Sequence, residues 1–176
     1  MMKFIFKTII FIAVFFVSCL IFLPKENLYN LLEKELYNYN IVVSEEIRNE
    51  ELFSLKIDSA EVYFDGINAA FIKDIDITTF LIFSKINIEK TTVSKSLKNF
   101  LPSKVKSLEL THSIIDFSNI KINSSGEFGE FKGKYSIFDK KVLGELIPSQ
   151  SMKSKYRNIL NQFKLEDGKY YYEYKL

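Results

Sequence analysis

Residues that carry chemistry are scarce in this chain of 176 residues, which has one cysteine, one histidine and no tryptophan. The single cysteine, Cys19, excludes a disulfide framework, and the single histidine, His112, excludes a metal site built from paired histidines. The chain also lacks a P-loop and a Gly-x-Gly-x-x-Gly fingerprint. We therefore predict no catalytic residues, no cofactor and no metal site, and we interpret His112 as a polar residue near a strand turn.

The chain also lacks a marked excess of charge of either sign. Lys3 and Lys7 account for the whole net charge of +2, because the 153 residues after position 23 contain 22 basic and 22 acidic side chains. Proteins that bind nucleic acid concentrate positive charge on one surface, so this balance argues against a nucleic-acid partner. The carboxylate pair Asp74 and Asp76 alternates with isoleucines, which is typical of the solvated face of a strand.

A long apolar run lies near the start of the chain. It begins at Phe4, ends at Leu23 and is interrupted by only three polar residues. A helix needs about 20 apolar residues to cross the hydrocarbon core of a bilayer. The run therefore predicts one N-terminal transmembrane helix, in which Lys7 extends its ammonium group back to the interface.

Two other interpretations of this run stay open. A cleaved signal peptide also starts with basic residues, but its apolar core is shorter and small residues precede the cleavage site, whereas this run ends in large residues. A lipoprotein signal would have to use Cys19, and Phe16 stands where a leucine is expected. Because Lys3 precedes the run and Lys7 lies in its first turn, an uncleaved helix predicts a cytoplasmic N-terminus at a bacterial inner membrane, with the bulk of the chain in the periplasm.

Three segments follow from this pattern. Residues 1–24 are expected to form the membrane anchor, residues 25–39 a linking amphipathic helix, and residues 40–176 an exported β-rich domain. Leucines at helical spacing predict the linking helix over residues 26–37. Its apolar stripe would either cap the following sheet or lie on the membrane interface, and we favour the cap. The stripe consists of Leu28, Leu31, Leu32 and Leu36.

From residue 40 onward, apolar residues recur with a period of two, which predicts strands. Asp65-Gly66 predicts a tight hairpin, since a type I′ turn needs positive φ at both central residues. Asp167-Gly168 leads into a final strand over residues 169–176, whose tyrosines predict a half-buried face. A single helical turn is expected over residues 94–100 and a helix over residues 151–163.

An internal repeat is also expected. Residues 54–67 can be aligned without gaps on residues 107–120, with four identities and three further positions of similar size and polarity. Such a repeat would build the domain from similar strand units placed side by side, with the helical segments as caps at the ends.

Apolar side chains on the strand faces are more numerous than a single thin sheet hides, unless the sheet curls or something apolar lies on it. We favour ordinary core packing as the explanation of these residues, and the alternative is that the inner face of such a curl forms a groove for an acyl chain or a protein partner. The residues expected in this groove are Leu55, Ile57, Val62, Phe64, Leu108, Leu110, Ile115 and Phe117.

Several stretches carry a resemblance to a known family. Besides the anchor, they are Pro-Lys-Glu-Asn-Leu-Tyr-Asn-Leu-Leu-Glu-Lys-Glu-Leu from Pro24, Tyr-Phe-Asp-Gly-Ile from Tyr63, Gly-Glu-Phe-Gly-Glu-Phe-Lys-Gly-Lys-Tyr from Gly126 and Leu-Ile-Pro-Ser from Leu146. In these stretches the chain resembles the type II secretion system protein N group, which is similar in turn to the AsmA-like envelope proteins. The resemblance implies an inner-membrane protein with a twisted periplasmic sheet, linked to a secretion machine or to lipid handling, and it offers no catalytic residues.

The expected fold is α+β and mainly β: a twisted, curled and mostly antiparallel sheet with two or three covering helices, preceded by one N-terminal transmembrane helix. The expected function is that of a non-enzymatic, single-pass component or accessory of an envelope secretion assembly. The alternative is a small AsmA-like lipid-binding or lipid-transfer protein. Expected partners are the membrane, through residues 4–23, envelope secretion or lipid-transport proteins, and phospholipid.

Overall fold

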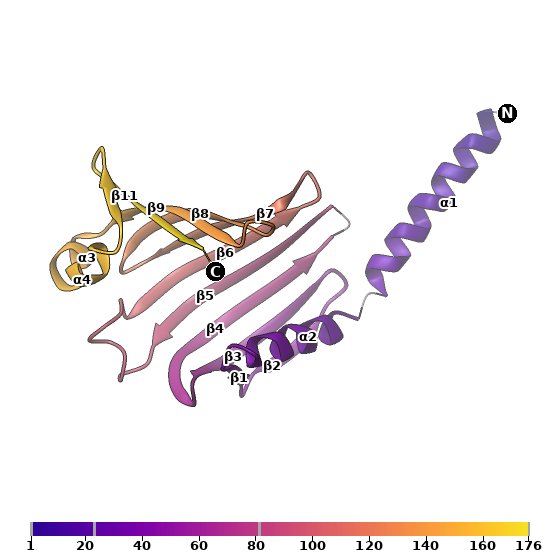
Figure 1. The fold of residues 1–176 in the computed structure, drawn as a ribbon. Coiled ribbons are helices and arrows are strands. Elements are labelled where there is room, and N and C mark those ends of the chain that lie inside the picture. Colours follow the sequence, from indigo (N-terminus) through magenta and orange to yellow (C-terminus); the bar gives the residue numbers. More distant parts are fainter. Residues whose placement is uncertain (1, 23, 81, 176) are drawn as a thin grey trace.

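The computed structural model describes residues 2–22, 24–80 and 82–175. These residues form four helices and eleven strands, and the strands pair antiparallel in one open, curled sheet (Figure 1). The helices are α1 (Met2–Ile21), α2 (Lys25–Tyr37), α3 (Gln150–Lys155) and α4 (Arg157–Leu160). The strands are β1 (Ile41–Ser44), β2 (Ile47–Glu50), β3 (Ser54–Phe64), β4 (Ile67–Thr79), β5 (Phe83–Val93), β6 (Lys104–Ser113), β7 (Asp116–Gly126), β8 (Gly129–Ser136), β9 (Lys141–Pro148), β10 (Lys164–Glu166) and β11 (Lys169–Lys175). The mainly β, antiparallel fold predicted from the period of two is confirmed.

The strands follow one another in the sheet almost as they do in the chain. Their order is β1-β3-β4-β5-β6-β7-β8-β9-β11-β10, and β2 pairs with β3 next to β1. In Figure 1, α2 lies along the β1 and β3 side of the curled sheet, whereas α3 and α4 lie at the opposite side, near β9 and β11. Three short helices therefore cover the sheet, within the two or three expected.

Tight turns fix the register at both predicted hairpins. Asp65 and Gly66 have φ of 50° and 78°, and Asp167 and Gly168 have φ of 48° and 79°. Positive φ at both central positions is what a type I′ turn requires. Both turn predictions are confirmed, and the final strand begins at Lys169 as expected.

The register gathers apolar residues of successive strands on one face of the sheet, here called the inner face. Paired residues share a face, and residues two apart along a strand share it as well. One row across the inner face reads Ile57, Ile75, Ile88, Leu108, Ser124, Phe131, Leu146 and Tyr170. The next row reads Leu55, Ile77, Ile86, Leu110, Ile122, Gly133, Gly144 and Tyr172.

The other face of the sheet, the outer face, carries polar residues in the same register. A row across it reads Lys56, Asp76, Asn87, Glu109, Asn123, Lys132, Glu145 and Tyr171. Asp74 lies on this face too, and its carboxylate accepts a bond of 2.9 Å from the Lys90 ammonium group. The interpretation of Asp74 and Asp76 as part of a solvated face agrees with this arrangement.

Helices cover the two sides of the inner face and leave its middle uncovered. Tyr29 of α2 packs with Leu55, Ile57 and Ala60, and these three residues are 0% exposed. On the other side, α3 and α4 contribute Met152, Tyr156 and Leu160, which bury Leu146. Between these two cores, the inner-face residues of β5, β6 and β7 are only half-buried. They include Ile86, Ile88, Leu108, Leu110 and Ile122.

The predicted helix over residues 26–37 is confirmed as α2, and it does pack on the sheet, but it uses a different face from the one expected. Tyr29 is buried, whereas Leu31 is 62% exposed and Leu28 and Leu32 are exposed as well. Arg48 of β2 accounts for this orientation. Its guanidinium group lies 4.6 Å from the centre of the Tyr29 ring and forms an ion pair of 2.9 Å with Glu33.

The segment after β9 forms two short helices and not the single helix predicted over residues 151–163. The chain leaves helical geometry at Tyr156, which has φ of −116° and ψ of 33°. The Tyr156 hydroxyl donates to the carbonyl oxygen of Lys98 over 3.3 Å. Residues 94–100, where a single helical turn was predicted, form hydrogen-bonded turns and no regular helix, with Leu97 N donating to Ser94 O.

The expected internal repeat does not correspond to equivalent structural units. Residues 54–64 form β3, but their counterparts at 107–117 cover the end of β6, a turn at residues 114 and 115, and the start of β7. In the alignment, the turn at residues 65 and 66 and the turn at residues 114 and 115 therefore lie four positions apart. Moreover, β3 and β6 run in opposite directions, because three antiparallel pairings separate them.

In residues 2–22, 24–80 and 82–175, no helix is both long enough and apolar enough for a membrane span. The transmembrane helix expected from the run between Phe4 and Leu23 is therefore not supported, and Leu23 itself lies outside the described residues. The apolar side chains of α1 are nonetheless exposed along its length, with Phe4 at 77% and Phe11 at 72%.

Candidate functional site

An apolar groove of about 460 Å³ lies where the uncovered middle of the inner face meets α3 and α4. Its floor is formed by β6, β7, β8 and β9, and its walls by the segment of α3 and α4, by the end of β5 and by the connections β5–β6 and β7–β8. The floor residues are Val105, Leu108, Ile122, Ser124, Phe131 and Leu146. The wall residues are Val93, Leu101, Pro102, Phe128, Met152, Ile159 and Phe163. Ser124 is the one polar side chain in this lining.

Two glycines give the ring of Phe131 its position in the floor. A Cβ atom on Gly144 would lie 2.2 Å from Phe131 Cζ, and one on Gly133 would lie 2.9 Å from Phe131 Cε1. The ring therefore lies directly over both backbones, which only glycine permits at these distances. This explains why two glycines stand in the middle of β8 and β9, where the residue is otherwise unfavourable.

Polar contacts hold the wall of the groove in place. The Ser149 hydroxyl accepts from Met152 N over 3.0 Å, which caps the start of α3, and it donates to the carbonyl oxygen of Glu127. The Glu127 carboxylate accepts from the Ser103 hydroxyl and backbone N–H and from the Ser151 hydroxyl. Glu127 thus connects α3 to the connection between β5 and β6 on either side of the groove.

The same contacts affect the protonation of Glu127. The hydrogen bonds that Ser103 donates from its hydroxyl and its backbone N–H favour the charged carboxylate and lower the pKa of Glu127 below its usual value. Glu127 is consequently an anion at neutral pH. It serves as a structural acceptor at the edge of the groove.

Of the expected groove residues, Leu55, Ile57, Val62, Leu108 and Leu110 lie on the inner face, but in different surroundings. Leu55 and Ile57 lie in the core beneath α2, where no surface remains for a ligand. Leu108 lies in the groove floor, and Leu110 is its half-buried neighbour two residues further along β6. Val62, which is paired with Val43 of β1, is half-buried at the β1 side of the sheet.

The remaining three expected residues do not lie at the groove. Phe64 is exposed at the end of β3, next to the Asp65-Gly66 turn. Ile115 is 92% exposed in the turn between β6 and β7, and Phe117 follows it at the start of β7. Phe117 packs edge-on against Phe138, with the ring centres 5.9 Å apart.

Most of the groove residues were not identified from the sequence. Val105, Ile122 and Phe131 come from three different strands, and no periodicity within one strand links them. Met152, Ile159 and Phe163 did show helical spacing, which was the one available signal, but the spacing does not reveal that this segment folds over β6 to β9.

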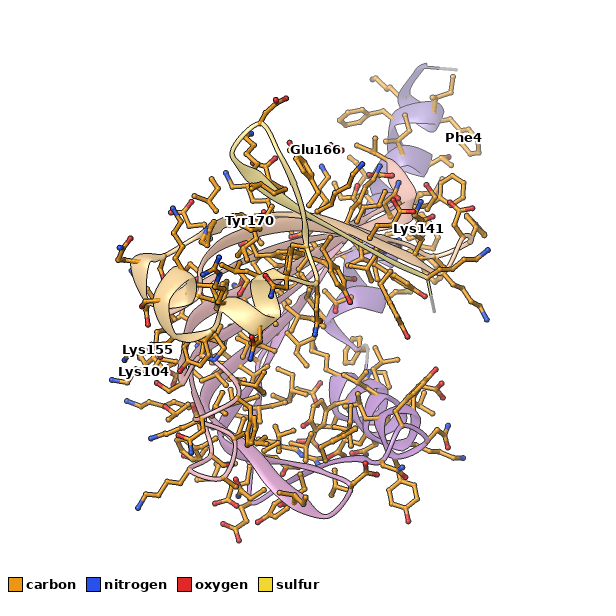
Figure 2. The ribbon with its side chains drawn as sticks, turned by 60° about the vertical axis from the view of Figure 1, so that its left-hand side comes forward. Phe4, Lys104, Lys141, Lys155, Glu166 and Tyr170 are labelled. Carbon is orange, nitrogen blue, oxygen red and sulfur yellow. The ribbon has the colours of Figure 1, made fainter. Side chains whose placement is uncertain are left out.

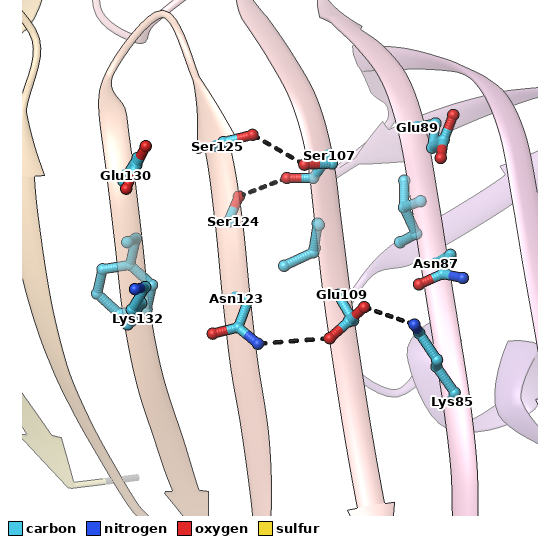
Figure 3. A pocket seen from close by; sticks show the side chains of 13 residues that line it. Lys85, Asn87, Glu89, Ser107, Glu109, Asn123, Ser124, Ser125, Glu130 and Lys132 are labelled. Carbon is cyan, nitrogen blue, oxygen red and sulfur yellow. Dashed lines mark hydrogen bonds and ion pairs between the residues drawn. The ribbon is translucent and has the colours of Figure 1, made fainter.

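The outer face carries a polar depression that differs from the groove in chemistry. Figure 3 shows its side chains, with Lys85 and Glu109 at 2.6 Å and the hydroxyls of Ser107 and Ser125 at 2.8 Å from each other. The hydrogen bond from Lys85 lowers the pKa of Glu109. Because these groups satisfy one another across three strands, we interpret the depression as an ordinary solvated sheet face.

In the part of the chain that the structure describes, no group of three or more His, Cys, Asp or Glu side chains is arranged to hold a metal ion. The His112 ring nitrogen Nε2 lies 3.0 Å from the carbonyl oxygen of Phe117, across the turn between β6 and β7. Comparisons of the chain with protein-family models, with curated proteins and with solved structures found no match. The resemblance to the type II secretion system protein N group stays a prediction.

Proposed function

We propose that this chain is a non-enzymatic lipid-binding protein, held at a membrane by α1, which takes an acyl chain of a phospholipid into the groove between its sheet and α3 and α4. The observation that carries the proposal is the lining of the groove, in which twelve of the thirteen residues are apolar and Ser124 is the exception. Its volume of about 460 Å³ falls within the range of roughly 300–1,000 Å³ for small-molecule sites.

The chemistry of the groove favours an acyl chain over a polar ligand. A ligand with charged or hydrogen-bonding groups would need partners in the lining, since buried polar groups without partners are costly. An acyl chain needs none, and each Å² of apolar surface that it removes from water contributes about 25 cal/mol. The phospholipid headgroup would stay in solvent at the open side of the groove.

The exposed apolar helix α1 supports the proposed place of action. The exposed apolar side chains of a helix are stabilised when other apolar groups surround them, and a lipid bilayer offers such surroundings. We propose the bacterial inner membrane, with the sheet on the periplasmic side, because Lys3 and Lys7 stand at the start of α1 and basic residues are enriched on the cytoplasmic side.

Retention of phospholipid by the full chain tests this function. We expect the protein, purified in a mild detergent and exchanged into a lipid-free one, to retain about one phospholipid per chain, as expected for a single groove. Quantitative mass spectrometry of the extracted lipid provides the measurement. A chain that is folded by circular dichroism but carries no phospholipid, and that takes none up from vesicles, would contradict the proposal.

A second candidate function is that of a component or accessory of an envelope secretion assembly, as in the type II secretion system protein N group. The exposed side of α2 favours it, because Leu28, Leu31 and Leu32 form an apolar stripe that the sheet does not cover. Co-purification of identified secretion proteins with the intact chain, lost on changing Leu31→Glu, would support this candidate. Retained phospholipid without such proteins would favour the lipid-binding function.

A further inference from the structure

The two ends of the strands differ in their chemistry, and the difference can be followed through the connections. The connections β4–β5, β6–β7 and β8–β9 lie at one end, together with the start of β3. The connections β3–β4, β5–β6 and β7–β8 lie at the other end, together with the start of α3. We call these the α1 end and the α3 end.

The α1 end is so named because α2, which follows α1, begins there, as the contacts of Lys25, its first residue, show. Its backbone N–H and its ammonium group both reach the carboxylate of Glu50, at 3.4 and 3.3 Å. Glu50 pairs with Leu55 near the start of β3, so α2 begins at this end, and α1 precedes it by only a short connection. In Figure 1, α1 projects from this end of the sheet.

Apolar side chains occupy the tips of the hairpins at the α1 end. They are all exposed, from 60% at Leu52 to 92% at Ile115. Together they form what we call the apolar rim, which consists of Leu52, Ile82, Ile114, Ile115, Phe117 and Phe138. Turns are normally built from Gly, Pro, Asn, Asp and Ser, so a turn made of Ile114 and Ile115 is not explained by turn chemistry.

The tips that carry the rim lie next to one another. Ile114 N donates to Ile82 O over 2.9 Å, which joins the tip of β6–β7 to that of β4–β5. The rings of Phe117 and Phe138 join the tip of β6–β7 to that of β8–β9. From Ile82 to Phe138 the rim is therefore one continuous edge, and the charged pair Asp139 and Lys140 follows Phe138 at the last tip.

The α3 end has a different composition. The connection β5–β6, the start of β6 and the last turn of α3 carry basic side chains, and exposed apolar residues such as Phe64 and Phe100 lie at this end as well. These basic residues are Lys95, Lys98, Lys104, Lys153 and Lys155. In Figure 2, Lys104 and Lys155 lie together on one side of the view, and Lys141 lies on the other side, toward Phe4 of α1.

We propose that the apolar rim docks into the surface of a lipid bilayer beside α1, so that the strands stand on the membrane and the α3 end points away from it. Exposed apolar and aromatic side chains that enter the interface by about 5–10 Å gain the free energy of apolar burial. The inference rests on the proposed membrane attachment by α1, but not on the ligand of the groove.

Fluorescence quenching in vesicles tests the docking of the rim. In full-length chains with Cys19→Ser, a single cysteine is introduced as Ile115→Cys or Ile82→Cys in the rim, or as Asn99→Cys in the exposed connection β5–β6 as the matched control. Each is labelled with an environment-sensitive fluorophore and reconstituted into vesicles of phosphatidylcholine and phosphatidylglycerol, with and without brominated acyl chains. We expect brominated chains to lower the fluorescence at the two rim positions about twofold, because the labels there would insert to the depth of an interfacial side chain. The fluorescence of the label at residue 99 should stay unchanged.

The wild-type chain labelled at Cys19 separates failure of the rim from failure of the anchor. Quenching at Cys19 without quenching at residues 115 and 82 would overturn the docking inference while the attachment by α1 stands. Absence of quenching at Cys19 as well would overturn both proposals. Equal quenching at residues 99 and 115 would also overturn the inference, because the two ends would then contact lipid alike. Far-UV circular dichroism verifies that each variant keeps the sheet.

Discussion

Leu108→Glu is expected to lower the phospholipid retained per folded chain at least about tenfold, a change equivalent to about 1.4 kcal/mol. Leu108 lies in the floor of the groove among Val105, Ile122 and Phe131. A carboxylate at this position would have to lose its hydration when an acyl chain enters, which costs several kcal/mol unless a cation pairs with it. Quantitative mass spectrometry of the extracted lipid gives the ratio of variant to wild type.

Thr111→Glu is the matched control for this change, because it places the same side chain on the opposite face of the same strand. Thr111 pairs with Lys85 on one side and Lys121 on the other, so the new carboxylate would have two cations nearby. We expect it to retain phospholipid at the wild-type level. Equal retention by Leu108→Glu and the wild type would mean that the lipid is bound elsewhere than in the groove.

Ile57→Ala is expected to lower the free energy of unfolding by about 2–5 kcal/mol, the range for truncating a fully buried isoleucine. Ile57 is 0% exposed and packs with Tyr29, Leu55 and Ile75, so the alanine leaves a cavity between α2 and the sheet. Urea unfolding of the full chain, followed by circular dichroism in the same detergent as the wild type, measures the loss.

The position of Ile57 adds a second expectation to the same variant. Because Ile57 belongs to the core beneath α2 and not to the groove, the fraction of Ile57→Ala that stays folded should retain as much phospholipid as the wild type. Ile47→Ala, at a position that is 60% exposed on β2, is the control and should change the stability by less than about 0.5 kcal/mol. A loss of lipid with unchanged stability in Ile57→Ala would contradict the account, because the core beneath α2 would then bind lipid and would not determine stability.

The strands and two of the turns could be predicted from the sequence because the relevant physics is local. Alternation of apolar and polar residues indicates which face of a strand is buried, and the Asp-Gly pairs at residues 65–66 and 167–168 indicate where the chain reverses direction. The turn at Ile114 and Ile115 carries no such signal. Its isoleucines therefore resembled a strand, and the predicted groove wrongly continued through Ile115 to Phe117.

The internal repeat failed for a related reason. Similar alternation arises in any amphipathic strand, so a gapless match between residues 54–67 and 107–120 does not distinguish a repeated unit from two unrelated strands. The direction of a strand within the sheet is set by the number of intervening hairpins. That number cannot be read from the matched residues themselves.

The groove could be predicted only as a class of site, since its residues come from segments that meet through long-range packing. Leu108 and Leu110 were expected on an inner face, but the boundary between core and groove depends on where α2, α3 and α4 lie. The break at Tyr156, stabilised by its bond to the Lys98 carbonyl oxygen, decides where Met152 and Ile159 reach the sheet. The local sequence around Tyr156 indicates neither its bond to Lys98 nor the packing of Met152 and Ile159 on the sheet.

Photo-crosslinking of the wild-type chain tests the central claim most directly. A phospholipid with a photoreactive diazirine near the end of one acyl chain is incorporated into vesicles that contain the full-length protein, and tandem mass spectrometry locates the crosslinked residues after illumination. The account predicts crosslinks to the groove lining on β6, β7 and β8 and on α3 and α4, such as Leu108, Ile122, Phe131 and Met152. Crosslinks confined to α1 and the apolar rim would contradict it, since the protein would then contact lipid without taking an acyl chain into the sheet.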